Sequence, residues 1–373
     1  MNDNQPWYVI EDIDRIDSPA LVVYPERVSE NIRTLKKMVN GNTDRLRPHI
    51  KTHKTKEATI LLMDAGIHQF KCATIAEAEL LGMIKAPDVL LAYQPVGPKV
   101  HRYLELIERY SNTSFSCLVD NLANAENLSV QAGKKGVKIR VYIDINVGMG
   151  RTGIPVGDEA IQLYQGIRLL DNMELLGLHV YDGHLRDPDI NQRRERCHLA
   201  FAPVWTMISE LERQGYPAPV VVAGGSPTFP IHAADARVVC SPGTFIFWDK
   251  GYGDGLPEQQ FQHAALVLTR IISLPTSTTL CLDLGHKSIA SENPLDRRVH
   301  LLNAPDLKPI GQSEEHLVVE VPAGHEWKIG DVFYGLPYHI CPTVALYEQA
   351  IAIVDGHQTG IWPIVARDRS IIV

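Results

Sequence analysis

The chain has 373 residues, a length that favours one large barrel plus a second module over a single small domain. With 45% hydrophobic and 21% charged residues, its composition is typical of a soluble globular protein with an ample core. The formal net charge of −8 argues against nucleic acid and anionic membranes as partners.

The N-terminal residues and the cysteines predict the cellular compartment. Residues 1–7 are polar, and no apolar stretch approaches the ~20 residues needed to span a bilayer, so neither a signal peptide nor a transmembrane segment is expected. The six cysteines are scattered without a CxxC pair, which predicts free thiols rather than a disulfide scaffold. We therefore expect a soluble, cytoplasmic protein.

Between residues 47 and 244, short apolar runs alternate with segments of helical pattern. The helical pattern is clear in residues 75–81, which are rich in strong helix formers. Eight strands alternating with helices over about 200 residues predict a (β/α)8 TIM-type barrel, with a doubly wound open sheet as the alternative. The predicted strands are 47–53, 68–74, 89–94, 114–120, 138–146, 175–182, 219–226 and 237–244.

The first predicted strand reads RPHIKTH and gathers positive charge at alternate positions, which are Arg47, His49, Lys51 and His53. A strand would place these side chains on one face, although charges are rarely buried unpaired. One interpretation is a solvated basic edge. The other is a reactive Lys51, because neighbouring cations lower a lysine pKa from about 10.4 and a free amine can form a Schiff base.

The same segment resembles the cofactor-lysine strand of the D-threonine aldolase and D-serine dehydratase family, whose pattern is Arg-Pro-His-x-Lys-Thr. Members of this family are pyridoxal 5'-phosphate enzymes of the alanine-racemase-like fold. The resemblance implies that Lys51 binds the cofactor as a Schiff base. It extends over nearly the whole chain through the motifs that follow.

Two further motifs are expected to hold the cofactor ring. Residues 144–153 resemble the family's Gly-Met-x-Arg-x-Gly, in which the arginine hydrogen-bonds the phenolate oxygen, so Arg151 takes that role. In the sixth strand His179 and Tyr181 share a face and match the family's ring-contacting stretch, whereas His184 lies on the loop beyond, free to reach substrate. The candidate catalytic residues are Lys51, Tyr181 and His184. Without the resemblance, Arg151 would be interpreted as a surface residue and His179 as a core residue.

Glycine-containing turns end the last two predicted strands, with the sequences AGGSPT from residue 223 and SPGT from residue 241. Glycine lets backbone N–H groups approach an anion, and Ser or Thr hydroxyls add donors. The loops after strands seven and eight are a common phosphate site in such barrels. Both turns also match the family's phosphate loops. The predicted phosphate ligands are Gly225, Ser226, Gly243 and Thr244.

After residue 254 the pattern changes to strands separated by turns, which predicts a second, mostly β domain over residues 255–373. Residues 16–254 form the predicted cofactor-binding barrel, and residues 1–15 are expected to join the second domain. The extended run of residues 18–25 is expected to pack with that domain, as in the alanine-racemase-like fold. The strand-like runs are 264–274, 279–284, 317–321, 331–341 and 349–354.

His339 and Cys341 are predicted to end a strand of this second domain, where the i, i+2 spacing places imidazole and thiolate side by side. Two ligands are too few for a closed structural zinc site and fit the catalytic pattern, although the spacing alone is often coincidence. The pair resembles the family's metal pair, which is His-x-Cys in the serine dehydratases and His-x-Asp in the aldolases. A divalent metal, zinc or manganese, would act there as a Lewis acid on the substrate's β-hydroxyl. Residues 312–316 also resemble a family stretch and predict either support for the site or a solvated acidic turn.

Together these motifs predict a homodimeric, metal-assisted pyridoxal-phosphate lyase acting on a small D-β-hydroxy amino acid. The leading activity is that of a D-threonine aldolase, which yields glycine and acetaldehyde. A D-serine, D-threonine or 3-hydroxyaspartate dehydratase is the alternative. A non-catalytic cofactor carrier and an amino-acid racemase are disfavoured by the metal pair. Ser241, where alanine racemases carry an arginine paired to the pyridine nitrogen, further disfavours racemisation.

Overall fold

The computed structural model describes residues 5–373, and the chain divides into two compact units. The chain passes from one unit to the other after residues 34, 51, 58, 243 and 367. The predicted domain boundary at residue 254 stays a prediction, and residues 1–4 of the predicted N-terminal contribution lie outside the described residues. We name the units by their content. The β unit is Met1–Thr34, Thr52–Ala58 and Thr244–Arg367, and the barrel unit is Leu35–Lys51, Thr59–Gly243 and Asp368–Val373.

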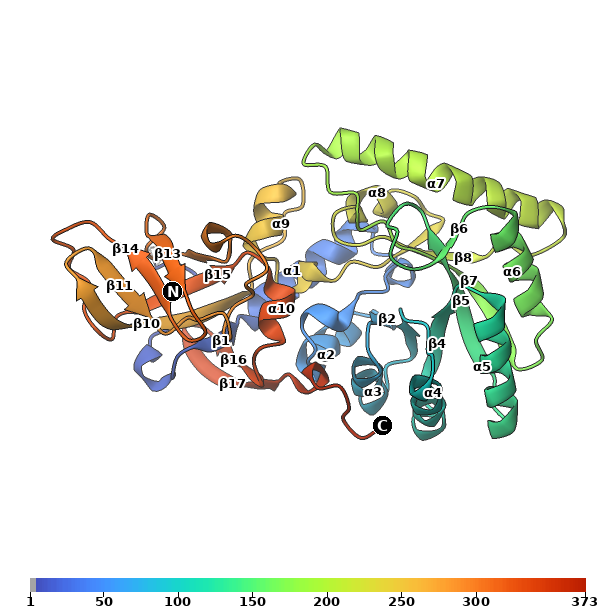
Figure 1. Ribbon diagram of the computed structural model, residues 1–373, viewed down its shortest axis with the longest axis horizontal. Helices are drawn as coiled ribbons and strands as arrows, with labels where there is room; N and C mark the ends of the chain where they lie inside the picture. Colours follow the sequence, from blue (N-terminus) through green and yellow to red (C-terminus); the bar gives the residue numbers. More distant parts are fainter. Residues whose placement is uncertain (1–4) are drawn as a thin grey trace. The chain divides into compact units, whose positions relative to one another are not determined.

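Seven parallel strands of the barrel unit follow one another in the order β2-β3-β4-β5-β7-β8-β9 (Figure 1). The ring is closed by residues 46–49, because Leu46 bridges Cys240 of β9 and His49 bridges Lys71 of β2. The predicted barrel is therefore confirmed, with this short segment in place of a first strand. The strands are β2 (Gln69–Cys72), β3 (Asp88–Leu91), β4 (Ser114–Val119), β5 (Ile139–Asn146), the accessory β6 (Ile154–Pro155), β7 (Met173–Val180), β8 (Val220–Ala223) and β9 (Val238–Cys240).

Helices connect successive barrel strands, and their ends carry recognisable caps. At the start of α3, the Thr74 hydroxyl accepts the Glu77 N–H while the Glu77 carboxylate accepts the N–H of Ala73, one residue before the N-cap, which is a variant of the capping box. The helices up to residue 233 are α1 (Pro25–Met38), α2 (Lys56–Asp64), α3 (Ile75–Met83), α4 (Pro98–Arg109), α5 (Leu122–Lys135), α6 (Asp158–Arg168), α7 (Ile190–Arg213) and α8 (Phe229–Ala233).

The interior of the barrel is a packed core. Leu90, Leu118, Tyr142 and Val222 come from four different strands and form one buried cluster. Inward-facing side chains of this kind fill a (β/α)8 barrel, so that the space left for a ligand lies at the carboxyl ends of the strands.

The segment that carries Lys51 differs from its prediction. Residues 50–52 form a short 3-10 helix rather than a strand, because pairing with the neighbouring strands stops after two bridges. The alternate cationic side chains therefore do not share one face. Arg47 is buried and donates to Asp88 over 2.5 Å in the barrel unit. His53 is buried in the β unit, where burial lowers its pKa to about 3.

The β unit contains a nine-stranded sheet in the order β13-β14-β11-β10-β1-β16-β17, with β15 beside β10 and β12 beside β15. The N-terminal strand β1 pairs antiparallel with β10 and parallel with β16. Val22, Leu266, Leu268 and Leu336 belong to the buried cluster on this sheet. The strands are β1 (Ala20–Val23), β10 (Ala265–Thr276), β11 (Thr279–Leu282), β12 (Val299–Leu301), β13 (Lys308–Gln312), β14 (Leu317–Glu320), β15 (Val332–Pro337), β16 (Gln349–Val354) and β17 (His357–Pro363). The short helices are α9 (Lys250–Gly255) and α10 (Ile340–Val344).

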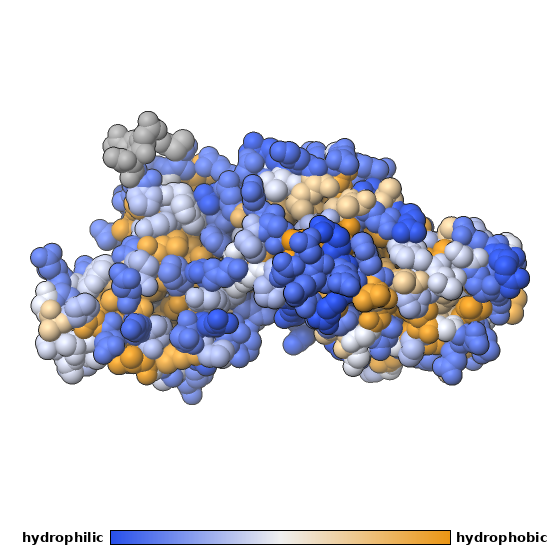
Figure 2. All heavy atoms as spheres, turned by 90° about the horizontal axis from the view of Figure 1, so that it is seen from above, coloured by the Kyte–Doolittle hydropathy of each residue, from blue (hydrophilic) through white to orange (hydrophobic). Residues whose placement is uncertain are grey.

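Hydrophilic residues cover most of the face drawn in Figure 2. Large exposed hydrophobic side chains such as Leu169, Leu199 and Ile329 belong to different parts of the chain, as is normal for a protein surface. Among the described residues, no helix has both the length and the apolar character needed to cross a membrane.

The barrel core predicts a large difference between two leucine substitutions. Leu90 is 0% exposed and Leu169 is 83% exposed. Leu90→Ala should lower the free energy of unfolding by about 3 kcal/mol, because it removes buried methyl groups and leaves a cavity. Leu169→Ala should change it by less than about 0.5 kcal/mol. Urea denaturation followed by circular dichroism measures both, and equal effects would contradict the assignment of Leu90 to the core.

Candidate active site

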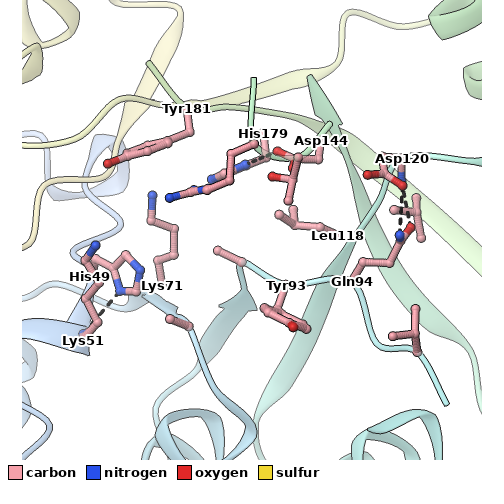
Figure 3. Close-up of a pocket in the computed structure, with 16 residues that line it drawn as sticks. His49, Lys51, Lys71, Tyr93, Gln94, Leu118, Asp120, Asp144, His179 and Tyr181 are labelled. Carbon is pink, nitrogen blue, oxygen red and sulfur yellow. Dashed lines mark hydrogen bonds and ion pairs between the residues drawn. The ribbon is translucent and has the colours of Figure 1, made fainter. Parts of the chain in front are cut away.

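A cavity of about 600 Å³ lies in the barrel unit, within the size range of small-molecule sites (Figure 3). Its wall is built from His49 and Lys51, at the end of the segment that closes the ring, and from the carboxyl ends of β2, β3, β4, β5 and β7. Lys51, Arg151, His179 and Tyr181 all line it. The structure thus brings four of the predicted residues together, and their individual roles stay predictions.

Asp144 holds His179 in place. Their side chains are both buried, and His179 Nδ1 lies 2.7 Å from an Asp144 carboxylate oxygen. Burial lowers the pKa of His179, so the neutral ring donates Nδ1–H in a hydrogen bond rather than an ion pair. Burial is the largest single influence on Asp144 and opposes its ionisation, but the hydrogen bonds from His179 and Thr152 and the nearby positive charges together outweigh burial and lower the Asp144 pKa. His179 Nε2 is buried with no hydrogen-bond partner among residues 5–373, which leaves it available to a ligand.

Tyr181 lies between two cations. The Arg151 guanidinium carbon is 5.0 Å from the centre of its ring, and Lys71 Nζ is 5.7 Å from it. A Cβ atom at Gly225 would lie 3.2 Å from Tyr181 Cε2, so a glycine allows the loop after β8 to approach this ring closely. The contacts fix the position of the tyrosine ring relative to the cavity.

Two lysines face the same cavity (Figure 3). Lys51 is exposed, whereas Lys71 on β2 is only 2% exposed. Burial, followed by the charge of Lys51, lowers the pKa of Lys71 to about 7. Sequence analysis did not single out Lys71. Its signal was a lone lysine inside an apolar run that was predicted to be a barrel strand.

The loop after β8 is anchored by the buried Asp182. The Thr228 hydroxyl and His232 Nε2 each donate to a different Asp182 oxygen over 2.8 Å, and these hydrogen bonds lower the Asp182 pKa although burial opposes them. Gly224 has a φ of +76°, and a Cβ there would lie 2.6 Å from the His232 ring, so the turn requires glycine. We name Asp182 and its two partners Thr228 and His232 the Asp182 clamp. These hydrogen bonds hold the end of the loop that contains the predicted phosphate ligands Gly225 and Ser226.

Asp182, Cys197 and His232 form the one group of three potential metal ligands among the described residues, with ligand atoms within 4.8 Å of one another. Both Asp182 oxygens already accept hydrogen bonds, and burial raises the pKa of the Cys197 thiol. A metal would need the thiolate, so the chemistry opposes a metal here. We therefore interpret Cys197 as a buried thiol beside the Asp182 clamp.

The predicted phosphate ligands Gly243 and Thr244 follow β9, and both are buried. The chain passes from the barrel unit to the β unit between them. Two residues earlier, the Ser241 hydroxyl donates to the Arg47 carbonyl oxygen over 3.0 Å. Ser241 therefore brings a neutral, already engaged hydroxyl to a position where alanine racemases carry a cation.

His184 lies beside the loop after β5 rather than in the cavity wall. A Cβ atom at Gly148 in that loop would lie only 3.0 Å from His184 Nε2, so the glycine allows the His184 ring to pack closely against the loop. His184 Nδ1 is buried and has no hydrogen-bond partner among the described residues. Its catalytic role stays a prediction.

His339 and Cys341 lie at the start of α10 and not on a strand, which corrects their predicted setting. Strand β15 ends at Pro337, and His339 is the N-cap of the helix. The physical reason is Pro342, which lacks the N–H needed for a strand ladder and has a backbone angle suited to the first helical turn.

The two side chains nevertheless interact. Burial is the largest single influence and acts to lower the His339 pKa, but the hydrogen bonds to Cys341 and Glu292 and the nearby negative charges together outweigh burial and raise the pKa to about 9. Cys341 Sγ lies 3.2 Å from the Thr52 hydroxyl and 3.7 Å from the Thr244 hydroxyl, all within the β unit. An imidazole, a thiol and a nearby carboxylate are a donor set that fits a divalent metal such as zinc.

In the acidic stretch 312–316, Gln312 ends strand β13 and residues 313–316 form an exposed turn. Lys287 forms surface ion pairs with Glu314 and Glu315, and Arg298 donates to the Gln312 side chain over 2.6 Å. The charges of this stretch are thus balanced within the β unit.

Sequence comparison places this barrel and its β unit in a known family. The profile described as "Alanine racemase, N-terminal domain" matches residues 23–250, and that described as "Putative serine dehydratase domain" matches residues 264–353. Because the first match covers more than half of the chain, the protein belongs to the alanine-racemase-like family of pyridoxal-phosphate enzymes. The predicted family and fold class are therefore confirmed.

Relatives narrow the enzyme class. The chain is 27% identical to D-threonine aldolase of Arthrobacter sp. over 95% of its length and 94% of the relative. It is 24% identical to 3-hydroxy-D-aspartate aldolase of Paracoccus denitrificans over 96% and 94%. The crystal structure of D-threonine aldolase from Filomicrobium marinum superposes with a TM-score of 0.86 at 25% identity, covering 94% of this chain and 95% of that one. Because aldolases are lyases, these relatives confirm the predicted enzyme class.

The Asp182 clamp predicts a specific defect in cofactor binding. Asp182→Ala leaves the buried Thr228 hydroxyl and His232 N–H unpaired, at a cost of about 1–3 kcal/mol each. The variant should melt at a lower temperature and bind pyridoxal phosphate at least about tenfold more weakly, because the phosphate loop is no longer held. Asp235→Ala, which removes a surface partner of Arg237, is the control. Cofactor titration by absorbance decides, and an unchanged affinity would show that the clamp does not support the loop.

Proposed function

We propose that this protein is a metal-assisted, pyridoxal-phosphate-dependent lyase for D-β-hydroxy amino acids, whose leading reaction cleaves D-threonine to glycine and acetaldehyde. The main observation that supports this proposal is that Lys51, Arg151 and His179 line one cavity at the carboxyl end of the barrel. The nearly full-length similarity to a D-threonine aldolase supports this class of reaction.

The residues predicted to bind the cofactor fit it chemically. Lys51 presents an exposed amine for covalent attachment, and Arg151 is the donor for the phenolate oxygen. His179 is neutral and keeps Nε2 open to the cavity, so it can contact the ring without adding charge. The backbone and hydroxyl donors at Ser226 and Thr244 suit a phosphate. When bound, pyridoxal phosphate supplies an electron sink for negative charge at the substrate's Cα.

We assign the metal to His339 and Cys341. His339 Nδ1 pairs with Glu292, so Nε2 is left to face a metal, and a carboxylate behind a ligating histidine is the usual support for such a bond. A divalent ion held there supplies Lewis acidity that polarises a hydroxyl oxygen.

A small amino acid is the kind of substrate that suits an enzyme of this family. That the protein acts as a homodimer is part of the proposal and follows from the family resemblance, and its proposed cytoplasmic location is supported by the free cysteines. Analytical ultracentrifugation of the purified protein tests the oligomeric state, and a strictly monomeric, active enzyme would remove that part.

Dehydration to an oxo acid and ammonia is the second candidate, and Cys341 favours it because His-x-Cys is the serine dehydratase form of the metal pair. The protein is also 27% identical over 242 residues to D-threo-3-hydroxyaspartate dehydratase of Delftia sp.. Incubating the holoenzyme with D-threonine separates the two reactions, since cleavage yields glycine and acetaldehyde whereas dehydration yields 2-oxobutanoate and ammonia. Formation of neither product pair would refute the lyase proposal for this substrate.

Lys51→Ala should remove both the visible absorbance of the bound cofactor and the activity, because it removes the amine that attaches the cofactor. Borohydride reduction followed by peptide mapping checks the attachment site in the wild-type protein. Lys54→Ala, which loses a neighbouring lysine in the β unit, should retain the absorbance. A reducible adduct that persists in Lys51→Ala would move the attachment to Lys54 or Lys71.

Chelation should abolish turnover and added divalent metal should restore it, while the cofactor absorbance survives. Cys341→Ala should lower the rate at least about 100-fold, since a lost Lewis acid forfeits several kcal/mol at about 1.4 kcal/mol per tenfold. Cys341→Asp should shift the metal preference from zinc towards manganese, because a carboxylate is a harder donor. Cys281→Ala is the matched control in the same unit. Full metal content and full activity in Cys341→Ala would exclude this metal site.

A further inference from the structure

Lys71 lines the cavity but has no part in the roles assigned above. It sits on β2, where its backbone N–H donates to the Pro48 carbonyl oxygen over 2.8 Å beside the bridge to His49. The contact that closes the barrel therefore also fixes Lys71. Its side chain is almost fully buried, and Figure 3 shows its amine between the ring of Tyr181 and the side of the cavity that carries Lys51.

Among residues 5–373, Lys71 Nζ forms neither a hydrogen bond nor an ion pair, and its aromatic neighbour is the ring of Tyr181. The carboxylates that attract it, Asp182 and Asp144, are already engaged by Thr228 and His232 and by His179, respectively. A buried ammonium without a partner is costly, so these surroundings favour the neutral amine. A neutral amine carries a lone pair and can accept a proton from whatever occupies the cavity.

Several charged groups set the proton affinity of this amine. Burial and the charges of Lys51 and Arg47 lower the Lys71 pKa, Asp182 and Asp144 raise it, and the balance is about 7. A group with a pKa near the working pH is an effective proton acceptor and donor. The other ionisable or charged groups on the cavity wall are His49, Tyr93, Asp120, Arg151, His179 and Tyr181.

Both reactions proposed for this enzyme move one proton between the substrate's β-hydroxyl and its Cα. In aldol cleavage the hydroxyl loses its proton, the O–H electron pair forms the carbonyl, and the Cα–Cβ bond breaks. The electron pair of that bond remains at Cα, which then takes up a proton to give glycine. In dehydration Cα loses a proton, and the departing hydroxide takes one up and leaves as water. Each reaction therefore needs one group that accepts a proton and returns it.

We propose that Lys71 is the proton-transfer residue of this active site, whose neutral Nζ accepts the proton that the substrate loses and whose ammonium form returns it. In aldol cleavage the proton passes from the β-hydroxyl to Cα, and in dehydration it passes from Cα to the departing hydroxide. The proton is conserved, so no co-reactant is needed. The choice of reaction rests on the proposed function, whereas the assignment of Lys71 rests on the cavity.

Lys71→Met and Lys71→Arg test this assignment in the holoenzyme. In the wild-type enzyme, kcat/KM should fall as the pH decreases through about 7, because Lys71 takes up a proton and can no longer accept one. Lys71→Met should lower kcat/KM about 100-fold or more and remove this limb of the pH profile. Lys71→Arg should be equally impaired, because a guanidinium does not give up its proton. Both should keep the cofactor absorbance, since Lys51 is intact.

The control is Lys138→Met, which changes an exposed lysine at the opposite end of the β5 strand and should leave the rate unchanged. An unimpaired Lys71→Met would overturn the proposal. So would an active Lys71→Arg, because it would show that Lys71 serves only as a positive charge for an anionic ligand.

Exchange of the glycine Cα protons in heavy water, followed by NMR, separates this proposal from the proposed function. Exchange needs the cofactor and a proton acceptor but no bond cleavage. An enzyme that exchanges glycine protons without converting D-threonine refutes the lyase proposal for D-threonine, and slower exchange in Lys71→Met still supports Lys71.

If both variants fail to fold, NMR titration of carbon-13-labelled lysines in the ligand-free wild-type protein decides. One lysine should titrate near 7, and titration of all of them near about 10.4 would overturn the assignment.

Discussion

The closure of the barrel by residues 46–49 is the constraint on which the rest of the site depends. Two backbone bridges, Leu46 to Cys240 and His49 to Lys71, complete a ring that the seven regular strands leave open. The segment is then released into a 3-10 turn, which presents Lys51 at the rim instead of inside the wall. The buried Arg47 side chain also ties this segment to strand β3, which lies one strand beyond β2, through its bond to Asp88. The element that closes the scaffold is therefore also the element that carries the attachment lysine.

Charge within the barrel unit is arranged for an anionic ligand. Lys51, Lys71 and Arg151 all reach the cavity, whereas Asp144 is engaged by a neutral His179. Uncompensated positive charge in a partly buried space is unfavourable in the empty protein and becomes favourable when a phosphate or carboxylate enters. The Lys71 pKa shows how the fold limits this cost before binding, since burial lowers it to about 7 and part of the Lys71 amine is then uncharged at neutral pH.

Most of the fold was predictable from the sequence because each barrel strand is a local apolar run between helical segments. The first strand was not, because its length is set by pairing with β2 and β9, which are distant in sequence. Lys71 was missed for a related reason, since only the closed ring shows that a lysine in β2 faces the cavity. His339 and Cys341 were correctly recognised as neighbours, but Pro342 places them on a helix start, where a strand periodicity does not apply. The gathering of Lys51, Arg151, His179 and Tyr181 was predictable because residues at the carboxyl ends of barrel strands converge.

The pairing of strand β1 has a consequence for how the chain is made. Every strand that hydrogen-bonds to β1 lies after residue 264, and Val22 pairs with Ile351. During synthesis, residues 20–23 therefore have no strand partner until β10 has been made, and their second partner β16 follows only near the end of the chain, whereas the barrel has all its strands once Cys240 has been synthesised. Domains generally fold as units during synthesis, and an unpaired apolar strand is prone to aggregate. The N-terminal strand of this protein thus remains unpaired during most of translation, and protection of residues 20–23 by a chaperone would prevent their aggregation in that interval.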